Sequence, residues 1–203
     1  MKKIDNWNEI EAKGMDDFKA LPIGAYECKI INAVENNNEQ SGKTTLKVMI
    51  DIASGEYKDY FKKRYDSNTA IDRRWDNNAT KYLAFEGENT SYFKGFITCV
   101  ENSNVGYKWN WEESTLRDKK IVGVFQYEEY KKQDGTRGIK VRLTKFRSLD
   151  KLKEIEVSDS IKMLDGSYIS YDDYNERLEN DDNKKLENIF GKDTNEEIQD
   201  LPF

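Results

Sequence analysis

Alternation of apolar and polar residues marks four segments of the chain as β-strands. Within each segment many apolar side chains recur at every second position, as in a strand with one buried face. These segments are residues 25–31, 46–52, 120–127 and 138–147. The polar stretch 36–43 predicts a loop between the first two, and the turn sequence Gln133-Asp134-Gly135 predicts a hairpin between the last two.

The residues between these two hairpins predict one further strand and two helices. Residues 57–65 interleave aromatic and basic side chains and suggest a third strand. Residues 69–85 have apolar side chains at helical spacing after possible capping residues, and a second short helix is expected near 91–100. This order predicts a mainly β (α+β) fold, a five-stranded Greek-key barrel of the oligonucleotide-binding (OB) type with inserted helices.

The chain divides into three blocks that differ in net charge. Residues 1–55 carry a net charge of −2, residues 56–147 a net charge of +5, and residues 148–203 a net charge of −9. Because affinity for phosphate depends on the local field, the basic middle block matters more than the global charge of −6. We therefore expect an N-terminal lead at 1–20, a binding core at 21–157, and an acidic, largely flexible tail at 158–203.

Composition argues against several classes of protein. The chain has no histidine and only Cys28 and Cys99, both in alternating stretches, which predicts buried free thiols and leaves no zinc set. We expect no enzyme activity, no metal and no cofactor, since the usual general base near neutral pH is missing. No stretch approaches the ~20 apolar residues of a membrane span, so a cytoplasmic location in a bacterial host is expected.

Aromatic and basic residues occur together in the way that single-stranded DNA binding requires. Bases stack on aromatic faces, and lysine and arginine follow the phosphates. On the expected strand 57–65 the basic side chains would share a face with Tyr60, opposite Tyr57, Phe61 and Tyr65. The predicted DNA-contact residues are Lys58, Tyr60, Lys62, Arg64, Lys94, Lys108, Trp109, Lys140 and Arg142.

Two sequences resemble catalytic motifs. Ser41-Gly42-Lys43-Thr44 resembles the end of a P-loop, but Asn37 stands where the first glycine is needed and a strand follows, so we reject it. Glu27 and Lys29, with Asp51, keep open a metal-dependent nuclease as an alternative. A further alternative is an interaction protein whose acidic block mimics nucleic acid.

The last residues, Asp200-Leu201-Pro202-Phe203 after an acidic stretch, resemble the tip of bacterial single-stranded DNA-binding proteins. Residues 51–66, 93–97, 100–109 and 124–130 resemble a family encoded by phages of Gram-positive bacteria, regarded as single-stranded DNA-binding proteins. The resemblance covers roughly residues 15–150.

These resemblances imply a non-catalytic protein that coats single-stranded DNA in phage replication or recombination. The tip would recruit partner enzymes, with Phe203 entering an apolar pocket and Asp200, Leu201 and Pro202 leading up to it. The sequence leaves the oligomeric state open and allows a homo-oligomer.

Overall fold

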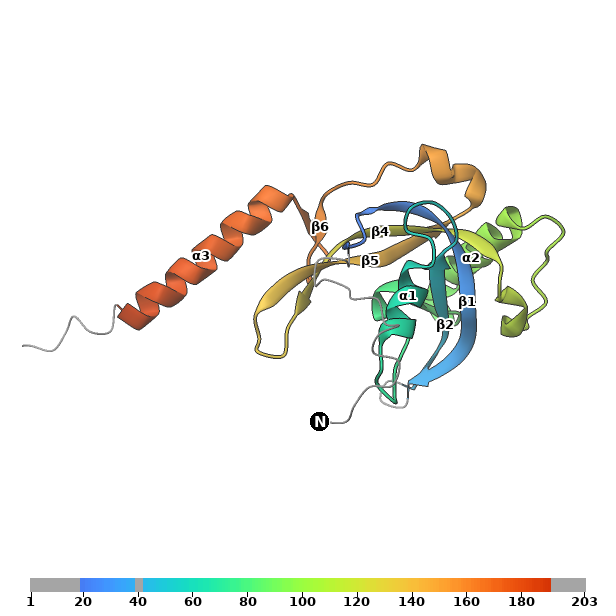
Figure 1. Cartoon of the computed structure of the whole chain (residues 1–203), viewed down its shortest axis with the longest axis horizontal. Helices are drawn as coiled ribbons and strands as arrows, with labels where there is room; N and C mark the ends of the chain where they lie inside the picture. The colour runs from blue at the N-terminus through green and yellow to red at the C-terminus, as the bar shows by residue number, and fades with distance from the viewer. Residues whose placement is uncertain (1–18, 39–41, 191–203) are drawn as a thin grey trace, which may run out of the picture.

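The protein is a mixed α+β structure built on one open, seven-stranded sheet (Figure 1). The computed structural model describes residues 19–38 and 42–190, without the side chains of Asn38 and of 181–190. The strands are β1 (Gly24–Asn38), β2 (Lys43–Ile52), β3 (Thr80–Ala84), β4 (Lys120–Lys131), β5 (Arg137–Arg147), β6 (Ile161–Lys162) and β7 (Tyr168–Ile169). The helices are α1 (Tyr60–Ser67), α2 (Thr90–Ser103) and α3 (Tyr171–Phe190), with short 3-10 helices between elements.

Strand order runs β3-β2-β1-β4-β6-β7, and β5 pairs with β4. β1 joins the two halves of the sheet, because residues 24–29 pair with β4 and residues 28–38 pair with β2, with an irregularity between Ile30 and Asn32. Among the described residues no ladder joins β3 to β5, so the sheet stays open between these two strands. All four alternating segments form strands and both hairpins are confirmed, although β1 continues to Asn38, into the stretch 36–43 that was expected to be a loop.

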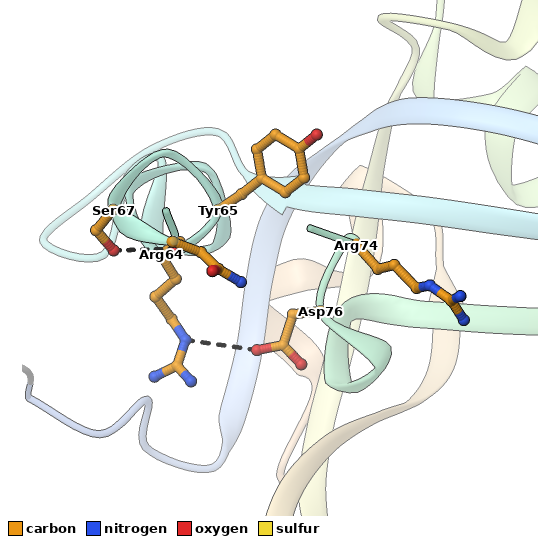
Figure 2. A pocket seen from close by; sticks show the side chains of 6 residues that line it. Arg64, Tyr65, Ser67, Arg74 and Asp76 are labelled. Atoms are coloured by element: carbon orange, nitrogen blue, oxygen red, sulfur yellow. Dashed lines mark hydrogen bonds and ion pairs between the residues drawn. The ribbon is translucent and has the colours of Figure 1, made fainter. Parts of the chain in front are cut away.

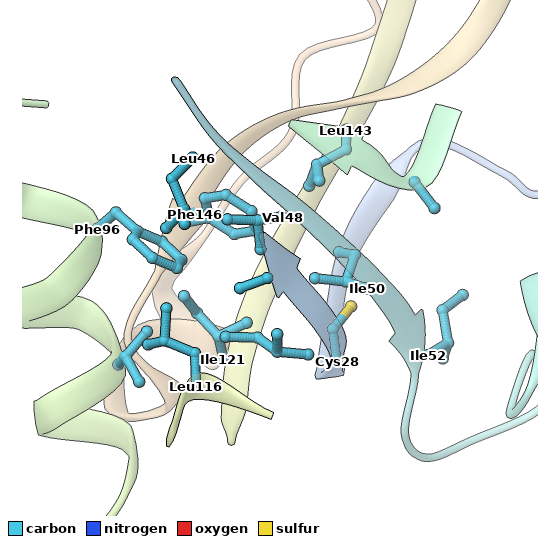
Figure 3. Close-up of a cluster of buried hydrophobic side chains, with 14 of the residues drawn as sticks. Cys28, Leu46, Val48, Ile50, Ile52, Phe96, Leu116, Ile121, Leu143 and Phe146 are labelled. Carbon is cyan, nitrogen blue, oxygen red and sulfur yellow. The ribbon is translucent and has the colours of Figure 1, made fainter. Parts of the chain in front are cut away.

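The core lies between the curved sheet and α2. Figure 3 shows side chains from β2, α2, β4 and β5 meeting there. Val48, Ile50 and Ile52 face inward at alternate positions of β2, as the sequence pattern predicts. Cys28 is a free thiol in this core, as predicted, and burial raises its pKa to about 12. Cys99 is also free but only half-buried.

The predicted third strand at 57–65 is wrong, because this segment forms a turn followed by helix α1. Asp51 on β2 explains the helix: its side chain is 1% exposed and accepts hydrogen bonds from the backbone N–H groups of Ile52, Phe61 and Lys62, at 2.9, 3.0 and 3.0 Å. Phe61 is buried and stacks on Phe125 of β4. A carboxylate distant in sequence thus caps the helix and holds it on the sheet.

Removing this cap is expected to destabilise the fold. Asp51→Ala leaves three N–H groups without their acceptor, and we expect the free energy of unfolding to fall by about 3 kcal/mol in urea denaturation followed by circular dichroism. Asp59→Asn is the control, since Asp59 precedes α1 but makes no side-chain capping bond. Equal stability of Asp51→Ala and wild type would show that the three bonds contribute nothing.

The predicted helix at 69–85 is also wrong. The chain instead runs in a loop to a 3-10 turn at Asn77–Ala79 and then forms β3, which pairs antiparallel with β2. Trp75 anchors the loop, because its indole N–H donates to the Ile50 carbonyl at 3.2 Å. Of the apolar side chains that suggested a helix, Trp75, Ala79 and Leu83 pack against the core, whereas Ile71 is fully exposed. The second predicted helix is confirmed as α2, which is longer at both ends than the expected 91–100.

The predicted start of the tail at residue 158 lies too early. β6 pairs parallel with β4 at Glu128, and Ile161, Met163 and Tyr174 form a second buried cluster. Glu129 holds this unit to the β4–β5 hairpin by accepting from the Leu164 N–H at 3.1 Å. Beyond it α3 projects from the body of the protein (Figure 1). Among the residues that the structure describes, no helix is long and apolar enough to cross a membrane.

Candidate nucleic-acid interface

A cleft of about 830 Å³ opens where β3 and β5 fail to pair. Its walls come from β3, α2, β5 and the β6–β7 hairpin, and we call it the seam cleft. The charged side chains and the tyrosines that line it are Lys81, Tyr82, Tyr92, Lys145, Arg147, Lys162 and Tyr168. No aspartate or glutamate is among the described residues of its lining.

Lys81 is the most unusual of these side chains. On β3 it lies opposite Val48, whose side chain is fully buried, so Lys81 stands on the inward face of the sheet. Burial lowers the pKa of Lys81, and the positive charges of Lys162 and Arg142 lower it further. An anion placed in the cleft would stabilise the protonated form of Lys81, because its negative charge would offset both effects that lower the pKa.

One carboxylate lies behind the cleft and is already neutralised. Glu128 accepts from Arg142 at 3.0 Å and from Lys162 at 3.4 Å. Although burial acts to raise it, the pKa of Glu128 is lowered overall by these two cations. The local balance of Lys81, Arg142, Lys162 and Glu128 therefore remains positive.

Three tyrosines expose their rings at the cleft. Tyr82, Tyr92 and Tyr168 are 44%, 74% and 52% exposed. Tyr82 lies directly across from Lys47 of β2, whose ammonium is 6.0 Å from the ring centroid. Such rings and cations are the two kinds of group that single-strand binding uses: bases stack on aromatic faces, and positive charges contact the phosphates.

Local backbone geometry on β5 directs the cations of this strand outward. The β4–β5 register shifts between Val124 and Phe125, where Thr144 forms the extra residue on β5. Beyond this bulge Phe146 is buried, while Lys145 and Arg147 on either side of it are exposed. The bulge therefore places two positive charges at the mouth of the cleft.

The predicted contact residues do not form one surface. Lys58 lies in the turn before α1, and Lys62 on that helix is ion-paired with Asp66. Lys94 is exposed on α2 but does not line the cleft. Because 57–65 forms a turn and the start of helix α1, the face that this segment was expected to present as a strand does not exist.

Lys108 and Trp109 follow α2 and belong to a local packing arrangement. Lys108 pairs with Glu101 at 3.2 Å, and the Trp109 backbone N–H donates to the same carboxylate. The Trp109 ring packs edge-on against Phe93. Trp109 therefore contributes to packing and is a poor platform for stacking bases.

Lys140 and Arg142 share one face of β5, as predicted, because they lie opposite Glu128 and Gln126 of β4. Lys140 lies over the Tyr130 ring, with 4.9 Å from its Nζ to the centroid. It also lines a hollow of about 140 Å³ together with Tyr60 and Arg64. Three predicted residues are thus brought together, although from a helix and a strand and not from two strands.

Two of the three side chains of the proposed nuclease set, Asp51 and Glu27, are engaged elsewhere. Asp51 caps α1, and Glu27 is paired with Lys120 at 2.9 Å and accepts from the Ser54 hydroxyl at 3.1 Å. Among the described residues no group of three histidine, cysteine, aspartate or glutamate side chains is placed to hold a metal ion. The tip, Asp200–Phe203, lies outside the described residues, and its role in recruiting partners stays a prediction.

Comparison with known proteins assigns no function. A profile of the family described as "Protein of unknown function (DUF669)" matches residues 7–88, which is less than half of the chain. The match spans β1, β2, α1 and β3, and with them Lys81 and Tyr82 of the cleft. No curated protein matches the chain.

Proposed function

We propose that this protein binds single-stranded DNA in the seam cleft. The observation that carries the proposal is the lining itself, in which four cations and three exposed tyrosines occur with no carboxylate among the described lining residues. Bases in a duplex are stacked on each other, whereas a single strand has free base faces for tyrosine rings. The cleft therefore suits a single strand better than a duplex.

Strand order supports an OB-type barrel as the scaffold. The first five strands follow the order β3-β2-β1-β4-β5, with α2 in the β3–β4 connection. In a partly open barrel of this type β3 and β5 face each other, and oligonucleotides bind near the β2–β3 face and the loop between the last two strands. The seam cleft adjoins that face.

The proposed role is to coat single-stranded DNA in phage replication or recombination. Recruitment of partner enzymes through Asp200–Phe203 is the second part of the proposal, and it rests on the sequence alone. The competing proposal, which rests on the acidic block at 148–203, is an interaction protein that mimics nucleic acid. That protein would bind a basic protein partner and ignore oligonucleotides.

Fluorescence anisotropy with a labelled single strand of ~35 nucleotides and its matching duplex distinguishes the two proposals. We expect clear preference for the single strand and an affinity that falls as salt is raised, because cations in the cleft release counterions from the phosphates. Equal affinity for duplex, or no binding at low salt, would contradict single-strand binding.

A further inference from the structure

The open seam between β3 and β5 extends beyond the cleft. At one end the cleft is lined by residues 81–84 of β3 and 144–147 of β5. At the other end the hollow beside Lys140 is lined by Asn78, just before β3, and by Val141 of β5. Residue numbers increase in the same direction along β3 and β5, so the cleft and this hollow are two openings of the same unpaired seam between the two strands.

A third hollow, of about 360 Å³, adjoins the second. Both hollows are lined by Arg64 and Asp76, and the third adds Tyr65, Ser67, Asn68 and Arg74 (Figure 2). In Figure 2 Arg64 reaches the Asp76 carboxylate from one side, whereas the Arg74 side chain lies on the other side and extends away from Asp76. The seam cleft, the hollow beside Lys140 (the Lys140 hollow) and the hollow lined by Arg64 and Arg74 (the arginine hollow) therefore follow one another along the molecule.

The arginine hollow has the chemistry of a phosphate site. Asp76 is its one carboxylate among the described lining residues, and it is engaged by the Arg64 Nε at 3.4 Å and by the Asn78 N–H at 2.8 Å. Arg74 makes no ion pair with any described residue. Arginine presents several N–H donors in a planar arrangement that fits phosphate oxygens.

The loop that carries Arg74 is held in place by its neighbours. Trp75 is anchored to β2 through the Ile50 carbonyl, and its ring packs 5.7 Å from that of Tyr65. Arg73 covers the same tyrosine, with 4.7 Å from its guanidinium carbon to the ring centroid. Arg74 therefore sits on a loop fixed at the preceding and following residues, which lowers the entropy cost of ordering it on a ligand.

We propose that the DNA strand leaves the seam cleft, passes Lys140 and places an internal phosphodiester group in the hollow between Arg64 and Arg74. This inference rests on the proposed function and adds a second contact region on the same strand. From Lys140 to Arg147 β5 spans about 23 Å at ~3.3 Å per residue. A strand of about 4 nucleotides, the lower end of OB-fold site sizes, is short enough to stay in the cleft, whereas one of about 16 nucleotides, the upper end, is long enough to reach the arginine hollow as well.

The test is a length series of oligothymidylates, from about 4 to about 16 nucleotides, bound to the full chain and to Arg74→Gln at ~0.1 M salt. We expect Arg74→Gln to leave the affinity for the shortest oligonucleotides unchanged and to weaken the longest about 5-fold, the effect of one phosphate contact. Arg64→Gln combined with Arg74→Gln should weaken the longest about 25-fold. Arg117→Gln, an exposed arginine that lines none of the three hollows, is the charge-matched control.

A loss that is the same at every length, or no loss at any length, would overturn the second contact region while leaving single-strand binding intact. Failure of wild type to bind any oligonucleotide would overturn the proposed function and this inference with it. Thermal unfolding of each variant by circular dichroism separates loss of contact from loss of fold.

Discussion

Replacing Lys81, Lys145 and Arg147 together with glutamine is expected to weaken binding of single-stranded DNA about 100-fold at ~0.1 M salt. Each cation that neutralises a phosphate contributes a slope of about −0.7 to the dependence of log affinity on log salt. The loss of three phosphate contacts should therefore make that slope less negative by about 2. Anisotropy titrations at four salt concentrations measure both quantities in one experiment.

The control for this variant carries the same change in charge away from the cleft. Lys19, Lys151 and Lys153 are exposed and do not line the cleft. Their replacement with glutamine should change the slope little, because the effect depends on contact with phosphate and falls off with distance from it. Equal losses in the two triple variants would show that net charge, and not the cleft, governs binding.

Replacing Tyr82 and Tyr92 together with alanine is expected to weaken binding by about 2–6 kcal/mol, since each stacked base contributes about 1–3 kcal/mol. The loss should persist at high salt, in contrast to that of the cation variant, because stacking releases no counterions. Tyr92 is 74% and Tyr82 44% exposed, so removing these rings should lower the free energy of unfolding much less than removing a buried ring would.

Trp111→Ala provides the matched aromatic control. Trp111 is 78% exposed, does not line the cleft, and belongs with Tyr107 and Trp109 to an aromatic cluster at 107–111, which includes the predicted contact residue Trp109. Anisotropy at ~1 M salt, where the Debye length is only about 3 Å, isolates the stacking contribution. A larger loss for Trp111→Ala than for the tyrosine pair would move the binding site to that cluster.

The strands that build the core could be predicted because their apolar period is local. β2 repeats inward side chains at 46, 48, 50 and 52, and no distant contact is needed to recognise it. The error at 57–65 has a physical cause: its apolar residues also fit helical spacing, with Tyr57 followed by Tyr60, Phe61 and Tyr65. The cap that favours the helix comes from Asp51, across a turn.

The cleft was missed because its residues come from four separated segments. Lys81 and Tyr82 fell within an expected helix, and Lys162 and Tyr168 fell within an expected tail. One signal was present, since a lysine alternating with Leu83 on an otherwise apolar strand face is unusual. Lys145 and Arg147 lie within the expected strand 138–147, but only the bulge at Thr144 explains why both face outward.

Photo-crosslinking tests the location of the DNA most directly. An oligothymidylate containing 5-iododeoxyuridine is irradiated with the full chain, and the crosslinked peptides are identified by mass spectrometry. Binding in the seam cleft predicts crosslinks at Tyr82, Tyr92 and Tyr168 that an excess of unlabelled single strand abolishes and an excess of duplex does not. Crosslinks confined to residues 107–111, or none at all under binding conditions, would contradict it.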